Sequence, residues 1–177
     1  MSSTSYLKPG IAAILLALLF PVYWTYILAT LGGDVIETIR HNFMTLHWSD
    51  ALFVVIGALE VYLLISLAKV FADIIDSKAI RILLLIMAAS SFVFHFLVVV
   101  DLFLATSQIA GSTADTIINV SLGIALAVDT LHVLAGLILA ILLLANKSEN
   151  SPLIKAFAII LLLISLFDLT LFLSVLN

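Results

Sequence analysis

Six ionisable side chains lie within stretches of the chain that are otherwise apolar. They are Glu60, His95, Asp101, Asp129, His132 and Asp168. An ionisable group in the hydrocarbon region of a membrane is costly unless it is paired, neutralised or hydrated. Such groups usually face the interior of a helical bundle, where they mark an ion path, a proton relay or a specific contact. We therefore expect any function to be carried by this ionisable layer.

Several chemistries fit these residue types. His95 and His132 on consecutive helices at similar depth could ligate a b-type haem, although four neighbouring carboxylates argue against a haem pocket. The same histidines with a carboxylate could hold iron, copper or zinc. Without a cofactor, imidazole and carboxylate groups can exchange protons near neutral pH. The plainest interpretation is that they form hydrogen bonds between helices. We expect no metal and no cofactor in this chain, with haem b as the alternative.

The elements that position these residues are predicted to be membrane-spanning helices. The chain has 177 residues, of which 64% are hydrophobic and 10% charged, with a mean hydropathy of +1.35. This composition excludes an ordinary soluble domain. Five stretches reach the length of about 20 residues that a span needs, roughly 10–31, 51–72, 82–105, 117–145 and 153–176. The prediction is one all-α bundle of five transmembrane helices, because a helix satisfies its own backbone in lipid.

The depth of the ionisable residues follows from the helical rise. At about 1.5 Å per residue, Glu60, His95, Asp129, His132 and Asp168 all fall about 20–24 Å from the cytoplasmic end of their spans. Asp101 lies closer to the outer interface. Asp129 and His132 are three residues apart and therefore share a helix face. Ser90 and Ser91, close to His95, are interpreted as a small-residue packing surface.

Orientation is predicted from the positive residues, which concentrate on the cytoplasmic side of membrane proteins. Six of the seven agree on an N-terminus inside and a C-terminus outside, and only Arg40 disagrees. The six are Lys8, Lys69, Lys78, Arg81, Lys147 and Lys155. The first span is interpreted as retained. We expect a multi-pass protein of a cell membrane, more consistent with a prokaryotic plasma membrane than with an organelle.

Other features limit the function classes. The chain has no cysteine, and it lacks the HExxH, GxSxG and phosphate-loop motifs and any basic patch for nucleic acid. We expect neither nucleic-acid binding nor an enzyme that acts alone, and we do not expect His41 and His47 to bind a metal. The longest connection, from Gly32 to Asp50, has room for one amphipathic surface turn.

The C-terminal half resembles subunit III of the haem-copper oxidases. Asp129-Thr130-Leu131-His132-Val133, with Gly136, is similar to that family's His-Gly-Leu-His-Val motif and its following glycine. Leu166 to Leu173 looks like the family's final helix, with Asp168 at its Phe-Val-Asp sequence. Val98 to Phe103 is similar to a segment in which the family places a Glu. Asp129 and Thr130 depart from the motif, and the N-terminal half carries no match.

The resemblance implies a non-catalytic subunit of a respiratory terminal oxidase that carries no metal or haem. Such a subunit packs against catalytic subunit I and other membrane subunits, binds phospholipid and supports proton uptake. Asp101, Asp129, His132 and Asp168 would then order the bundle or contact lipid and subunit I. Two alternatives stay open: a proton- or cation-coupled transporter or channel, and a b-haem quinone-reacting membrane anchor that uses His95 and His132.

Overall fold

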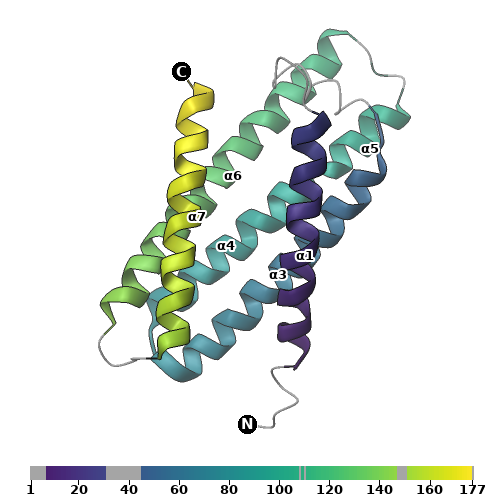
Figure 1. Cartoon of the computed structure of the whole chain (residues 1–177). Helices are drawn as coiled ribbons and strands as arrows, with labels where there is room; N and C mark the ends of the chain where they lie inside the picture. The colour runs from purple at the N-terminus through teal and green to yellow at the C-terminus, as the bar shows by residue number, and fades with distance from the viewer. Residues whose placement is uncertain (1–6, 31–44, 108, 110, 147–150, 177) are drawn as a thin grey trace.

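The structure is a computed structural model that describes residues 7–30, 45–107, 109, 111–146 and 151–176. Within these ranges every regular element is a helix, as the sequence predicted (Figure 1). The helices are α1 (Leu7–Thr30), α3 (Trp48–Ile75), α4 (Lys78–Phe96), α5 (Val98–Thr106), α6 (Ser112–Ala145) and α7 (Pro152–Leu176). Arg40, His41 and most of the predicted surface turn lie outside the described residues.

Five helical segments are long and apolar enough to cross a membrane, which confirms the predicted number of spans. They are Leu7–Ile27, Trp48–Ile75, Lys78–Thr106, Ser112–Ala145 and Pro152–Thr170. The third consists of α4 and α5, which join at Leu97 through hydrogen bonds from Leu97 N to Phe94 O and from Val100 N to Leu97 O. This tightened turn interrupts the regular ladder without ending the span. The chain is therefore a multi-pass membrane protein, and its orientation stays a prediction.

Capping residues define the start of α3 and the turn between α3 and α4. Asp50 accepts a hydrogen bond from the backbone N–H of His47 at 2.7 Å, which satisfies a donor at the start of α3. Asp76 has a φ of 46°, the left-handed conformation that often ends helices. Ser77 then caps α4 by accepting from the N–H of Ile80 at 3.5 Å. This short turn makes α3 and α4 antiparallel neighbours.

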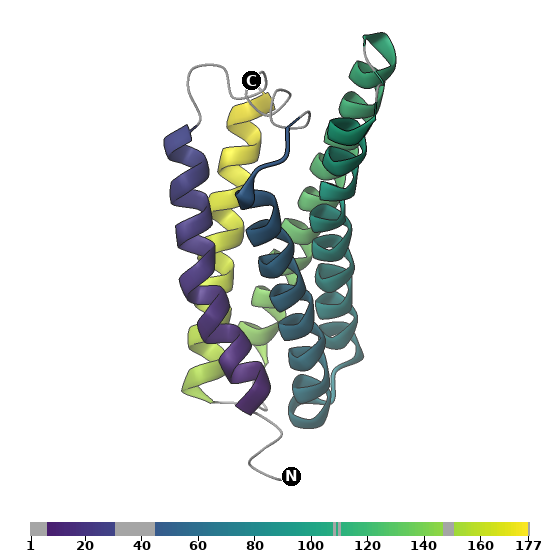
Figure 2. The ribbon, with the colours of Figure 1, turned by 90° about the vertical axis from the view of Figure 1, so that its right-hand side faces the viewer.

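The helices pack mainly against their neighbours in the chain. The extensive contacts are between α1 and α3, α3 and α4, α4 and α6, and α6 and α7. Turned by 90°, the molecule shows α1 and α7 on one side and α4 and α5 on the other, with α3 between them (Figure 2). Lipid-facing positions such as Leu163 and Ile164 remain exposed, as expected where the solvent is hydrocarbon.

The main apolar core occupies the half of the bundle that contains the α3–α4 turn. Its centre is formed by Leu64, Leu84, Met87 and Leu139, with Ala158 from α7. Close to it, α6 and α7 approach each other at Gly136, where an added Cβ would lie 2.7 Å from Oγ of Ser165. The opposite half has a smaller core around Leu104, Ala114 and Ile118. The predicted ionisable layer lies between these two cores along the helices.

Candidate functional site

Glu60 is the centre of a polar cluster that joins three helices. Its Oε2 accepts a hydrogen bond from Ser91 Oγ of α4 at 2.8 Å. Its Oε1 lies 3.7 Å from Nε2 of His132 on α6. The carboxylate therefore contacts a hydroxyl donor on α4 and an imidazole on α6, and such partners are what a polar group inside a membrane requires.

His95 extends this cluster along α4. Its Nδ1 lies 2.8 Å from the backbone carbonyl oxygen of Ser91, one helical turn earlier. Because a carbonyl only accepts, Nδ1 carries the proton in this pair, and in the neutral ring Nε2 is then the unprotonated nitrogen. Ser91 Oγ lies 3.4 Å from the same Nδ1. His95, Ser91, Glu60 and His132 thus form one continuous series of polar contacts. We call these four residues the Glu60 cluster.

The position of His95 depends on Gly57, one turn before Glu60 on α3. A Cβ at residue 57 would lie 2.7 Å from Cδ2 of His95 and would also overlap Cβ and Cγ of that side chain. Gly57 therefore leaves the space that the imidazole fills. The ring of Phe53, one turn earlier still, lies against the imidazole with a centroid distance of 4.2 Å and an interplanar angle of 34°. Phe53, Gly57 and Glu60 share one face of α3 at helical spacing.

Asp129 and Asp168 lie at the other end of the cluster. Asp129, three residues before His132 on α6, is within electrostatic range of His132 and Glu60. Asp168 on α7 is within electrostatic range of Asp129 and His132. The close α6–α7 approach involves Ser165, about one turn before Asp168, and Gly136, about two turns after Asp129. The structure therefore groups five of the six predicted residues on α3, α4, α6 and α7.

Asp101 is the residue that the structure places elsewhere. It lies on α5, within electrostatic range of Asp50 of α3 and Tyr23 of α1. Its Oδ1 is buried and has no hydrogen-bond partner among the described residues. We call Tyr23, Asp50 and Asp101 the outer polar group, because the predicted orientation puts it near the outer interface.

Three residues that form the site, Ser91, Gly57 and Phe53, were not predicted to belong to it. Ser91 was interpreted as a packing residue, but its side chain is 3% exposed and donates to Glu60. Ser90 fits the packing interpretation better, since its buried hydroxyl has no partner among the described residues. Gly57 and Phe53 were overlooked. The spacing Phe53-x₃-Gly57-x₂-Glu60 was the available signal, because it puts an aromatic, a space and a carboxylate on one helix face.

The arrangement of these side chains can be compared with what ligation of a metal ion or a haem iron requires. Among the described residues, no group of three or more His, Asp or Glu side chains is arranged to hold a metal ion. Nε2 of His132 faces Glu60, so it would have to leave that carboxylate to ligate a haem iron. His47 instead pairs its Nε2 with Oγ1 of Thr45 at 2.8 Å.

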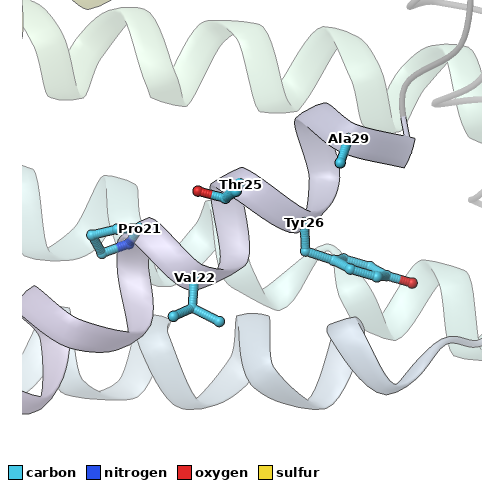
Figure 3. Close-up of a pocket in the computed structure, with 5 residues that line it drawn as sticks. All are labelled: Pro21, Val22, Thr25, Tyr26 and Ala29. Atoms are coloured by element: carbon cyan, nitrogen blue, oxygen red, sulfur yellow. The ribbon is translucent and has the colours of Figure 1, made fainter.

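A shallow hollow lies on α1, beside the proline inside that helix (Figure 3). Its lining consists of Pro21, Val22, Thr25, Tyr26 and Ala29. A second hollow lies where α7 begins beside the end of α3, and it includes Phe71 and Phe157. Neither contains a residue of the Glu60 cluster, so the polar chemistry of this chain is not associated with these hollows.

The fold and the site together define a five-span α-helical membrane protein with a Glu–Ser–His cluster in its interior. Comparison of the chain with protein-family models, with curated proteins and with solved structures finds no match.

Proposed function

We propose that the chain exchanges protons within the membrane at the Glu60 cluster. The observation that supports this most is the facing pair of Glu60 and His132, whose Oε1 and Nε2 atoms are 3.7 Å apart. A carboxylate and an imidazole at this separation can share or transfer a proton with small movements, directly or through one water. Both groups belong to the residue types that proteins tune to titrate near neutral pH.

The surroundings of the pair support the same proposal. Ser91 Oγ donates to Glu60 and lies 3.4 Å from Nδ1 of His95, so it lies between the carboxylate and the second imidazole. Asp129 and Asp168 supply further proton-accepting groups within electrostatic range of His132. Together with Asp129 and Asp168, the Glu60 cluster brings five titratable side chains to one region of the bundle, more than contacts between helices alone require. Intramembrane carboxylate and histidine series of this kind are typical of proton relays.

Glu60→Gln is expected to reduce the number of protons that the purified protein takes up on acidification. The amide keeps the size of the side chain and an oxygen for Ser91, but it does not titrate. Proton uptake per chain is measured with a pH-indicator dye in weakly buffered detergent solution. Asp115→Asn, an exposed carboxylate at the start of α6, is the matched control. Equal uptake curves for wild type and Glu60→Gln would contradict the proposal.

We further propose that the chain works as a subunit III-like, non-catalytic subunit of a haem-copper terminal oxidase. The support is the C-terminal resemblance. The helices that carry two of the three resembling segments, α6 and α7, lie against each other at Gly136 and Ser165. In this role the cluster would support proton uptake by catalytic subunit I, with phospholipid bound between helices. The chain itself would need no metal or haem.

Purification from the native membrane under mild conditions tests this assignment. Copurification with a haem-bearing catalytic subunit, and no haem absorbance from the chain after separation, is the expected result. Proton- or cation-coupled transport by the same cluster is the alternative. A sustained proton flux through proteoliposomes containing this chain alone, abolished by Asp129→Asn or Asp168→Asn, would favour transport over the subunit role.

A further inference from the structure

Phe53 lies between the Glu60 cluster and the outer polar group. Its ring is 5.3 Å from the ring of Tyr23 on α1, with an interplanar angle of 27°. On the other side it is 4.2 Å from the imidazole of His95. Phe94 covers it from α4, with a centroid distance of 5.5 Å. An apolar ring is therefore inserted between two sets of groups that could pass protons.

Beyond Phe53, toward the end where α1 ends and α3 begins, the outer polar group lies beside the smaller apolar core of α5 and α6. Asp50 and Asp101 both interact electrostatically with Tyr23. Oδ1 of Asp101 is buried without a partner among the described residues. The carboxylate of Asp50 already accepts a hydrogen bond from the backbone N–H of His47 at the start of α3. Polar groups of this kind can hold water, which requires a polar and roomy site with several partners.

In the opposite direction the cluster meets a packed apolar core. Leu64 follows Glu60 by one turn on α3, and Met87 precedes Ser91 by one turn on α4. Leu139, two turns after His132, is fully buried in the same core. Cores of this kind are close-packed and contain few spaces large enough for water. A water-mediated path from the cluster to the α3–α4 turn would have to cross this core.

We infer that the Glu60 cluster exchanges protons with one side of the membrane only, the side at which α3 begins, and that Phe53 controls this access. The inference rests on the proposed function, because sidedness matters only for a cluster that exchanges protons. In the predicted orientation this side is the outer one. The ring of Phe53 separates Tyr23 from His95, and its displacement would connect the two polar regions.

The absence of cysteine makes the inference directly testable with single introduced thiols. Ser91→Cys places a thiol of similar size inside the cluster. Lys78→Cys marks the α3–α4 turn side, and Ser112→Cys marks the opposite side. Each variant is reconstituted in sealed proteoliposomes and exposed to a membrane-impermeant cationic thiosulfonate from one side at a time. The two marker thiols define which side is exposed.

The thiol at position 91 is expected to react from the Ser112 side and not from the Lys78 side. Adding Phe53→Ala is expected to raise its reaction rate about tenfold, equivalent to removing about 1.4 kcal/mol of barrier. Phe92→Ala is the matched control and should leave the rate unchanged. It truncates a ring of the same size on α4 that faces lipid and is 56% exposed. If Ser91→Cys does not fold, His132→Cys supplies the same measurement.

The inference would be overturned by reaction from the Lys78 side, by reaction at equal rates from both sides, or by no acceleration by Phe53→Ala beyond that of Phe92→Ala. A thiol that stays unreactive even with Phe53→Ala would overturn it too. The outcome of the proton-uptake experiment is independent of the outcome of the thiol experiment. Glu60-dependent uptake with two-sided reactivity removes only the inference, whereas one-sided reactivity without uptake removes the proposed function and leaves only a cluster that is accessible from one side.

Discussion

Replacing Glu60 with leucine is expected to lower the free energy of unfolding by about 3 kcal/mol, near the low end of the cost of breaking one side of a buried ion pair. The substitution removes the acceptor of Ser91 and leaves the imidazole of His132 without its carboxylate. The low end applies because the His132 and Glu60 side chains are 25% and 22% exposed. Unfolding of the purified protein followed by circular dichroism in detergent measures the loss.

A double-mutant cycle separates the cost of a broken pair from the loss of packing. His132→Leu alone should also destabilise, but Glu60→Leu combined with His132→Leu should recover part of the loss, because neither polar side chain is then left without its partner. Glu60→Gln is the conservative control and should cost only about 1 kcal/mol, since its amide oxygen can still accept from Ser91. Strictly additive losses would show that Glu60 and His132 do not interact.

Gly57→Ala is expected to destabilise the protein by about 2 kcal/mol, the usual cost of adding a methyl group to a packed position. The new Cβ would overlap the Cβ, Cγ and Cδ2 atoms of His95. Rotation about χ1 cannot move Cβ away, so α3 and α4 must separate or the imidazole must leave its place. Thermal unfolding in detergent and the proton-uptake measurement should both register the change.

Gly123→Ala on α6 is the matched control, because nothing lies within 4 Å of a Cβ added there. An interior helical glycine replaced by alanine without a clash should be stabilising by about 0.5–1 kcal/mol. Gly57→Ala combined with His95→Gly removes the three overlapping atoms and should cost less than the sum of the two single changes. If Gly57→Ala behaves like Gly123→Ala, Gly57 does not make room for His95.

The sequence predicted the spans well because hydropathy and length suffice for that purpose. The helices begin a few residues earlier than the predicted spans, at Trp48, Lys78 and Ser112, since polar and interfacial residues can continue a helix beyond the hydrocarbon region. The break at Leu97 was not predicted. Neither glycine nor proline marks it, and the residues on both sides are apolar, so no local signal was available.

The site could be predicted only by residue type and depth. The rise per residue placed Glu60, His95 and His132 at one level, but the rotation of each helix about its axis decides which side chains meet. That rotation is set by contacts between helices, such as the fit of His95 against Gly57, which a single sequence does not display. The same limitation explains why Ser91 was interpreted as a packing residue, although it joins Glu60 to His95.

Infrared difference spectroscopy of the reconstituted protein tests the central claim most directly, because it observes protonation of a carboxyl group itself. On acidification, the wild-type protein should develop a carboxylic acid C=O band that shifts in D₂O and is missing from Glu60→Gln. The band should remain in Asp115→Asn. A wild-type spectrum that lacks any band sensitive to Glu60→Gln would contradict proton exchange at Glu60.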